Sequence, residues 1–315
     1  MNYKLSVVIP VYYNEKNLPI TYARLKEAVF DHVPDYELIL VDDGSEDNSW
    51  AEMQKIRAQD DKVKIIRLSR NFGSITAQLA GLSYVTGDCA TVIAADLQDP
   101  PEIILDLMEK WKNGTKVCLA VRADREEGFI QKTISNTFYK IMRKFALKNM
   151  PLGGFDCFLI DRQVVEVLKN IEEKNSSIVG QILWCGFKTE QISYVRKARE
   201  IGESRWTLSK KIKYFMDSIL AFSYAPIRMT IVGGSLIAFA SFLLMLFLMI
   251  ERLFMSVPIR GWTSIVCLIL FTFGVQLIIL GMIGEYLWRA LDESRKRPAF
   301  IVDEHIGIND ESTKT

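Results

Sequence analysis

Short runs of carboxylates, amides and glycines recur along the first hundred residues, and these residue types can bind a nucleotide and a metal. The runs are PVYYNE at 10–15, DDGS at 42–45, RNFG at 70–73 and DLQDPP at 96–101. Carboxylates suit ribose hydroxyls, base N–H groups and hard divalent cations. A single Asp-Asp-Gly-Ser segment is usually only a turn with a helix cap, so the evidence for a binding site comes from the four runs in order. The sequence has neither a GxGxxG fingerprint after its first apolar run nor a GxxxxGK[ST] loop.

Each polar run follows a predicted strand. We expect strands at 5–11, 37–41, 63–68, 89–95 and 116–121, and helices at 18–30, 48–59, 75–85 and 102–113. Continuous apolar strands that alternate with helices predict a parallel sheet covered on both faces. Such sheets bind ligands beyond the carboxyl ends of their strands, where the polar runs lie. The predicted fold class is therefore α/β, with a mostly parallel sheet.

The composition excludes several other classes of protein. The 315 residues include 39 Lys and Arg against 38 Asp and Glu, so the chain lacks the excess of positive charge that coats nucleic acid. The two histidines, His32 and His305, make a histidine-centred triad or metal site a poor hypothesis. The five scattered cysteines form no CxxC pair, which favours reduced thiols in the cytosol.

Two apolar segments, 229–250 and 261–284, contain no charged residue. Each can cross a hydrocarbon core of about 30 Å at about 1.5 Å per residue. The short connection between them predicts a hairpin. Lys and Arg flank the outer ends of the hairpin more densely than its connection, so the positive-inside rule places both chain termini in the cytoplasm.

Two basic amphipathic segments, 129–148 and 208–224, suit helices at a membrane interface, although packing on the sheet is the alternative. The expected organisation, by residue numbers, is 1–207 for the cytoplasmic α/β domain, 208–226 for a juxtamembrane helix, 227–288 for the two transmembrane helices and 289–315 for a cytoplasmic tail. The tail is expected to be extended. Its segment 300–308 could add a strand to a neighbouring chain in a homo-oligomer.

Taken together, VVIPVYYNE, VDDGS, RNFG and ADLQDPPE resemble the family 2 glycosyltransferases of GT-A, Rossmann-like fold. The resemblance runs from the first strand to the second apolar segment. Within that family, the chain most specifically resembles the polyprenyl-phosphate glycosyltransferases, which include bactoprenol glucosyltransferases and dolichol-phosphate mannosyltransferases. The two-segment hairpin favours the bactoprenol branch.

The resemblance implies an activity and a location. The chain would transfer one sugar, most simply glucose from UDP-glucose, to undecaprenyl phosphate by an inverting displacement. Mg²⁺ or Mn²⁺ would assist, and the reaction would take place at the cytoplasmic face of the inner (plasma) membrane, in the synthesis of cell-envelope glycans. No nucleic-acid partner is implied.

Residue roles follow from the same resemblance. The residues expected to bind the donor nucleotide are Pro10, Tyr12, Glu15, Asp42, Asp43 and Asp96. Asp96 and Gln98 would also hold the metal, with donor phosphates and waters completing the shell, because Ala94 replaces the first Asp of the usual D-x-D-x-Q. Asp99 is expected to act as a cap before Pro100 and Pro101, with help in holding the metal as the alternative. One extra tyrosine, Tyr13, leaves open which of two neighbouring rings faces the base.

The catalytic aspartate and the acceptor site are also implied. Asp156, within GGFDCF, matches the segment that supplies the family's proposed catalytic aspartate, as a base or as a positioning group. The residues expected to bind the acceptor phosphate are Arg122, Lys132, Ser135 and Arg205. Because a phosphate monoester has a second pKa of about 6, the acceptor is largely dianionic at neutral pH and does not strictly need a general base.

Three alternatives stay open. Another donor, such as GDP-mannose, UDP-N-acetylglucosamine or an aminoarabinose derivative, would use the same scaffold. A processive polysaccharide synthase would typically carry Q-x-x-R-W and more spans, whereas Gly202 precedes Arg205 here. A non-enzymatic, membrane-anchored nucleotide-sugar binder would be consistent with Ala94.

Overall fold

The computed structural model describes residues 2–308 except 97, 125–136, 138, 152–153, 172, 174–175, 196–207 and 255–260. The chain divides into two compact units. The first comprises Met1–Ser218 together with Pro298–Thr315, and the second comprises Ile219–Arg297. The candidate site lies in the first unit.

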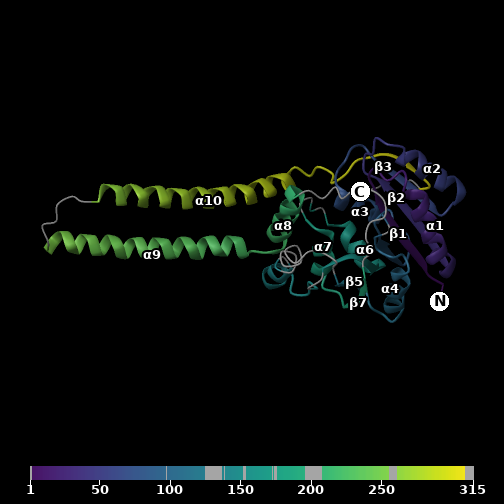
Figure 1. Cartoon of the computed structure of the whole chain (residues 1–315), viewed down its shortest axis with the longest axis horizontal. Helices are drawn as coiled ribbons and strands as arrows, with labels where there is room; N and C mark the ends of the chain where they lie inside the picture. Colours follow the sequence, from purple (N-terminus) through teal and green to yellow (C-terminus); the bar gives the residue numbers. More distant parts are fainter. Residues whose placement is uncertain are drawn as a thin grey trace. The chain divides into compact units, whose positions relative to one another are not determined.

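A β-sheet forms the centre of the first unit (Figure 1). It has eight strands in the order β7-β5-β6-β4-β1-β2-β3-β8. The strands are β1 Lys4–Val11, β2 Asp35–Asp42, β3 Val63–Leu68, β4 Cys89–Val92, β5 Val117–Asp124, β6 Phe155–Asp161, β7 Thr189–Val195 and β8 Val302–Ile306. The pairs β1–β2, β1–β4, β2–β3 and β5–β7 are parallel, whereas β6 and β8 pair antiparallel with their neighbours. The predicted α/β class is confirmed, and β6 and β7 are strands that were not predicted from the sequence.

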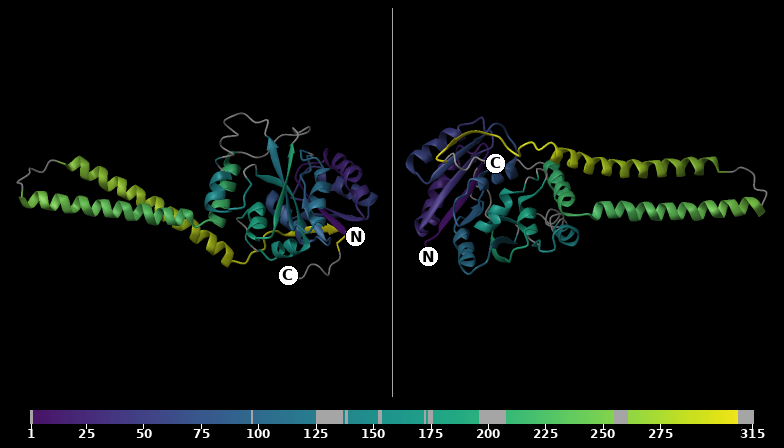
Figure 2. Two further views of the ribbon diagram at one scale, coloured as in Figure 1. Left: turned by 90° about the horizontal axis from the view of Figure 1, so that it is seen from below. Right: turned by 180° about the vertical axis from the view of Figure 1, so that it is seen from behind.

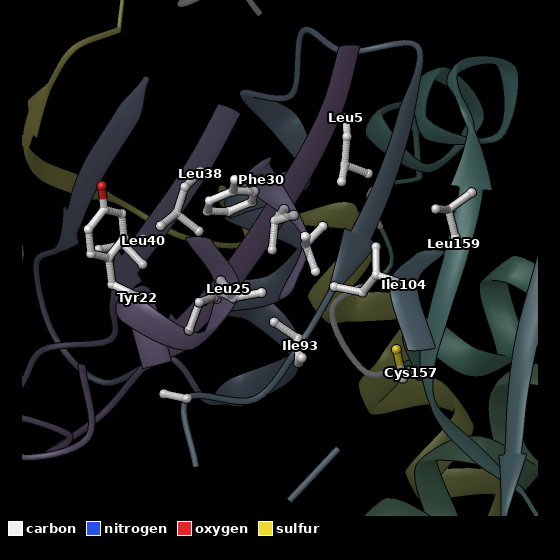
Figure 3. Close-up of a cluster of buried hydrophobic side chains, with 14 of the residues drawn as sticks. Leu5, Tyr22, Leu25, Phe30, Leu38, Leu40, Ile93, Ile104, Cys157 and Leu159 are labelled. Atoms are coloured by element: carbon white, nitrogen blue, oxygen red, sulfur yellow. The ribbon is translucent and has the colours of Figure 1, made fainter. Parts of the chain in front are cut away.

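Helices cover both faces of the sheet. They are α1 Leu18–Ala28, α2 Ser49–Gln59, α3 Ser74–Ser83, α4 Ile103–Lys112, α6 Arg162–Lys169 and α7 Ile178–Trp184, with a 3₁₀ turn η1 at Phe30–His32. Helices α1, α2 and α4 pack on the face that includes Leu5, Leu40 and Leu159 (Figure 3). Helix α3 packs against Val8 and Val41 on the opposite face. Alternate residues of β1 are therefore buried on both sides, as parallel strands require.

The core is built from large apolar side chains that are fully buried. Burying one such side chain contributes roughly 1.5–3 kcal/mol. Cys89, Cys118 and Cys157 are buried free thiols in this core, as the scattered cysteines predicted. Burial raises the pKa of both Cys118 and Cys157 to about 12, so these thiols are protonated and chemically quiet.

The C-terminal segment returns to the chain's own sheet. Strand β8, in the yellow C-terminal segment of Figure 2, pairs antiparallel with β3. His305 lies opposite Ile66, and Val302 lies opposite Leu68. The backbone N–H of Ser69 also donates to the carbonyl of Ile301 at 3.0 Å. The expected extended tail is therefore a strand, and its partner in this structure is the same chain.

The remaining helices are long. Helix α8 spans Leu208–Phe222, where the amphipathic pattern predicted a helix, and residues 139–145 of the other amphipathic segment are also helical. Helices α9, Ala225–Phe254, and α10, Trp262–Ser294, contain the two apolar segments. Within them Ala225–Leu244 and Phe271–Ser294 are long and apolar enough to cross a membrane by length and composition.

Candidate functional site

The carboxyl ends of the central strands bring four of the sequence motifs to one edge of the sheet. Strands β1, β2, β3 and β4 are mutually parallel, so the residues after each strand meet at this edge. Strand β5 runs in the same direction, because β6 is antiparallel to both β4 and β5. The loops that follow these strands are tied to one another by hydrogen bonds.

Asp43 joins the DDGS loop to the RNFG loop. Its carboxylate accepts the backbone N–H of Phe72 at 2.7 Å and of Gly73 at 2.9 Å, and its own N–H donates to the carbonyl of Val11 at 2.9 Å. The side chain is buried, and this burial raises its pKa to about 6, against the opposing effect of the two loop amides. Asp43 therefore fixes the relative positions of three loops.

Asp42 is also buried and organises the same turn. One carboxylate oxygen accepts the backbone N–H of Ser45 at 3.0 Å, and the other lies 3.5 Å from Nε of Arg67. Burial raises the pKa of Asp42, although Ser45 and Arg67 act in the opposite direction. Both aspartates predicted to bind the donor thus have protein partners, and a direct donor contact stays a prediction for each.

Gly44 lets these two loops approach each other. Its φ is +71°, a left-handed conformation that glycine adopts without steric cost. A Cβ atom at this position would lie 2.6 Å from the backbone C of Arg70 and 2.6 Å from the backbone N of Asn71. The bonds from Asp43 to the second loop therefore require glycine here.

In the loop after β1, the extra tyrosine, Tyr13, adopts a left-handed backbone conformation. Tyr13 has a φ of +55°, and its N–H donates to Oγ of Ser45 at 3.0 Å. Its hydroxyl donates to Glu46 at 3.2 Å, and its ring packs edge-on against Tyr12 with centroids 4.7 Å apart. The side chain of Tyr13 is thus held against Glu46. Tyr12 and Pro10 are half-buried at the end of β1, where the predicted base contact would lie.

Glu15 has a positioning contact. Its carboxylate accepts the backbone N–H of Asn48, the N-cap residue of α2, at 3.1 Å. The neighbouring N–H of Asn14 donates to Oγ of Ser49 at 2.9 Å. These two bonds fasten the loop after β1 to the start of α2, and a donor contact by Glu15 stays a prediction.

The loop after β4 carries the two predicted metal ligands. Asp96 and Gln98 are half-buried, and the N–H of Gln98 lies 3.3 Å from a carboxylate oxygen of Asp96. Thr21 of α1 holds the start of this loop by donating to the carbonyl of Ala95 at 2.8 Å. A carboxylate and an amide oxygen are hard donors that fit Mg²⁺ or Mn²⁺. The described residues contain no cluster of three His, Cys, Asp or Glu, so such an ion would depend on phosphates and water for its other ligands.

Asp99 has a different role from the predicted cap. Helix α4 has Glu102 as its N-cap residue, while the buried carboxylate of Asp99 accepts the hydroxyl of Tyr194 at 2.5 Å. Tyr194 lies on β7, directly opposite Arg122 on β5. Tyr194 was not among the predicted site residues because β7 was not predicted. The only sequence signal for this strand is the short alternation of polar and apolar residues at 191–194 within TEQISYV.

Asp156 lies in a β-bulge at the same edge of the sheet. In the β5–β6 register Ala120 pairs with Cys157 and Val121 pairs with Phe155, so Asp156 is the extra residue. Bulges are common next to active sites, where they redirect a side chain. The backbone of Asp156 is therefore near that of Arg122. The other three residues expected at the acceptor phosphate lie outside the described residues: Lys132, Ser135 and Arg205.

Comparison with known families agrees with this arrangement of a sheet and edge loops. Residues 6–169, which run from within strand β1 to the end of helix α6, match the model of the family described as Glycosyl transferase family 2. The chain belongs to this family and is a glycosyltransferase.

Its relatives match over nearly their whole lengths. The uncharacterized glycosyltransferase YkcC of Bacillus subtilis is 40% identical over 304 residues, which cover 96% of this chain and 94% of the relative. The bactoprenol glucosyl transferase of Shigella phage SfV is 35% identical over 302 residues, which cover 95% and 98%. The prophage bactoprenol glucosyl transferase homolog of Escherichia coli is 33% identical over 302 residues, which cover 95% and 98%.

Proposed function

We propose that this chain transfers a single sugar to a polyprenyl phosphate such as undecaprenyl phosphate. The first candidate for the sugar is glucose, with UDP-glucose as the donor. The observation that carries the proposal is its similarity to the bactoprenol glucosyl transferase of Shigella phage SfV over 95% of the chain. A match of that length includes residues of the two C-terminal apolar helices as well as the family domain. A lipid acceptor gives a glycosyltransferase domain a reason to carry such helices.

The apolar helices support a location in a membrane. Large apolar side chains of α9 and α10 are exposed, among them Leu236 at 65% and Ile278 at 67%. Exposure of so much apolar surface to water is costly, and a bilayer would cover it. The helices would form a hairpin in the inner (plasma) membrane. The Lys and Arg residues outside the hairpin would then place both termini and the first unit in the cytoplasm.

The donor would lie on the loops after β1 and β2. Tyr12 and Pro10 would contact the base, and the buried carboxylates of Asp42 and Asp43 would hold the surrounding loops in shape. The support is geometric: Asp43 connects the loops after β1, β2 and β3 through three hydrogen bonds. Loops fixed in advance bind a ligand without a further cost of ordering.

The diphosphate of the donor would lie next to Asp96 and Gln98, which would hold Mg²⁺ or Mn²⁺. When bound, such an ion supplies Lewis-acid stabilisation of the departing diphosphate. Arg122, Lys132, Ser135 and Arg205 would bind the acceptor phosphate, which attacks the anomeric carbon from the opposite face with inversion. Because this phosphate is already anionic, Asp156 would orient it or accept its residual proton.

A donor screen with the full-length protein in detergent tests the proposal. The reaction would contain undecaprenyl phosphate, Mg²⁺ or Mn²⁺ and one of several UDP- and GDP-sugars, and the lipid product would be identified by its mass. Transfer of one hexose from UDP-glucose, lost in Asp96→Ala, is the expected result. A Lys112→Gln variant, on the solvent side of α4, is the matched control and should retain transfer.

The other outcomes distinguish the alternatives. Transfer from a different nucleotide sugar would keep the reaction class and change the donor. A ladder of products that grows by one sugar at a time would indicate a processive synthase. Nucleotide binding without transfer to lipid from any donor would favour a non-enzymatic binder and overturn the proposal.

A further inference from the structure

The hydroxyl of Tyr194 lies between a carboxylate and a guanidinium group. It donates to Oδ1 of Asp99 at 2.5 Å, and both side chains are buried, with Tyr194 8% exposed and Asp99 3% exposed. The backbone of Tyr194 on β7 is paired with that of Arg122 on β5. Burial and the Asp99 carboxylate raise the pKa of Tyr194, while the positive charge of Arg122 acts in the opposite direction. The hydroxyl therefore keeps its proton and stays a donor to Asp99 throughout the physiological pH range.

This contact fixes the far end of the loop after β4. Asp99 follows the two predicted metal ligands, Asp96 and Gln98, by three residues and one residue. The start of the same loop is held by Thr21, which donates to the carbonyl of Ala95 at 2.8 Å. The loop is thus fastened at one end to α1 and at the other end to β7.

The contact also joins two parts of the site that no shared loop connects. Asp99 and Tyr194 are 95 residues apart in the chain. One lies in the loop with the predicted metal ligands, and the other lies opposite the strand residue Arg122, which is predicted to bind the acceptor phosphate. A shift of either element would have to break a short bond to a buried carboxylate. Because the site is buried, water cannot replace the lost donor.

We propose that Tyr194 is a positioning residue whose hydrogen bond to Asp99 holds Asp96, Gln98 and Asp99 in register with Arg122. The metal-bound diphosphate of the donor and the acceptor phosphate would then be kept at a fixed separation. This inference rests on the proposed function for the identity of the two substrates. A displacement of about 1 Å at such a site can reduce the rate about a hundredfold, so a single fixed contact matters for turnover.

The test compares Tyr194→Phe with a matched variant that loses the same kind of bond elsewhere. Tyr36→Phe is that control, because the hydroxyl of Tyr36 on β2 donates to the carboxylate of Asp60 at 2.7 Å, at the opposite edge of the sheet. Both variants are expected to lower the unfolding temperature, Tyr36→Phe by the smaller amount because the hydroxyl of Tyr22 also donates to Asp60 at 2.9 Å. Only Tyr194→Phe is expected to raise the Mn²⁺ concentration for half-maximal activity and the KM for undecaprenyl phosphate, each by about tenfold.

A conservative variant separates the effect of the Tyr194–Asp99 hydrogen bond from that of the negative charge on Asp99. Asp99→Asn keeps an amide oxygen that can accept the hydroxyl of Tyr194, so both constants should stay within about threefold of the wild-type values. If Asp99→Asn is as impaired as Tyr194→Phe, the hydrogen bond is not what positions the loop and the inference is wrong. Unchanged constants in Tyr194→Phe, with only a loss of stability, would also overturn it.

A second readout keeps this inference distinct from the proposed function. Calorimetry of Mn²⁺-dependent UDP binding needs no acceptor and no turnover. If the wild-type protein transfers no sugar to any lipid, the proposed function fails, while weaker Mn²⁺-dependent UDP binding by Tyr194→Phe would still support the positioning of the loop. If the wild-type protein is active and Tyr194→Phe binds UDP and Mn²⁺ normally, only the positioning role fails.

Discussion

Replacing Gly44 by alanine should separate the DDGS and RNFG loops and weaken nucleotide binding. The new Cβ atom would lie 2.6 Å from two backbone atoms of the second loop, those of Arg70 and Asn71. Ordinary contact begins near 3.4 Å, and backbone atoms cannot rotate out of the way as a side chain can. The loops must therefore separate by roughly 1 Å.

The energetic cost has two parts. Holding alanine at a φ of +71° costs about 1–2 kcal/mol. A separation of roughly 1 Å also stretches the bonds from Asp43 to Phe72 and Gly73, now 2.7 Å and 2.9 Å, beyond the range of a hydrogen bond. Loss of one such bond to a charged group costs about 1.5–3 kcal/mol more. With one of the two bonds lost, the expected total is about 2.5–5 kcal/mol.

Gly114→Ala is the matched control. Gly114 has a φ of +92°, so alanine is strained there as well, but no atom lies within 4 Å of the place that its Cβ would take, and the residue is in the turn between α4 and β5. Unfolding in detergent can be followed by the fluorescence of the six tryptophans, and UDP affinity by calorimetry with Mn²⁺. We expect Gly44→Ala to lower the midpoint temperature of unfolding by roughly 5–15 °C and to weaken the affinity for UDP about tenfold.

The control should lose a smaller amount of stability and keep the wild-type affinity for UDP. Equal effects of the two substitutions on stability, together with unchanged UDP affinity in Gly44→Ala, would refute the reasoning. That result would mean that the contact between the loops is not needed for the donor site.

Three further predictions concern buried or edge groups. Burial acts to raise the pKa of Glu37, but hydrogen bonds led by that from Lys64 outweigh it and lower the pKa to about 2. Glu37→Gln should therefore lower the free energy of unfolding by about 3 kcal/mol at neutral pH. In unfolding experiments, the difference in stability between wild type and variant should narrow as the pH falls from about 4.5 towards 2. Burial raises the pKa of Asp43 to about 6, so the contribution of Asp43 to stability should fall as the pH rises from about 4 to 6. The affinity for UDP, measured by calorimetry at several pH values, should rise over the same interval and level off above it. Arg122→Lys should raise the KM for undecaprenyl phosphate about tenfold and leave UDP affinity unchanged, because lysine cannot reproduce a bidentate contact to phosphate.

Each of these predictions has a result that would contradict it. A stability difference between wild type and Glu37→Gln that widens below about pH 4.5 would reverse the assigned pKa shift. A UDP affinity with the same pH dependence in Asp43→Asn and in wild type would assign that dependence to another group. An unchanged KM for undecaprenyl phosphate in Arg122→Lys would remove Arg122 from the acceptor site.

The sequence determined the local elements and the order of the motifs on them. Strand β3 was predicted with its observed bounds, and α2 and α4 to within one residue at each end, because periods of 2 and 3.6 residues and helix-end signals are local properties of the chain. The parallel β1, β2 and β4 followed from their continuous apolar runs. The rule that ligands bind beyond the carboxyl ends of such strands then selected the edge of the sheet where the motifs meet.

The tertiary structure alone decided which distant segments complete that edge. Strands β6, β7 and β8 join the sheet through pairings with residues far away in the chain, and no local period specifies a partner. Asp99 resembled a helix cap because capping is the local use of an aspartate before prolines. Its actual partner, Tyr194, is 95 residues away and reaches it only because β7 pairs with β5. Such contacts depend on the free energy of burying whole layers together, and that free energy belongs to the folded chain rather than to any segment of it.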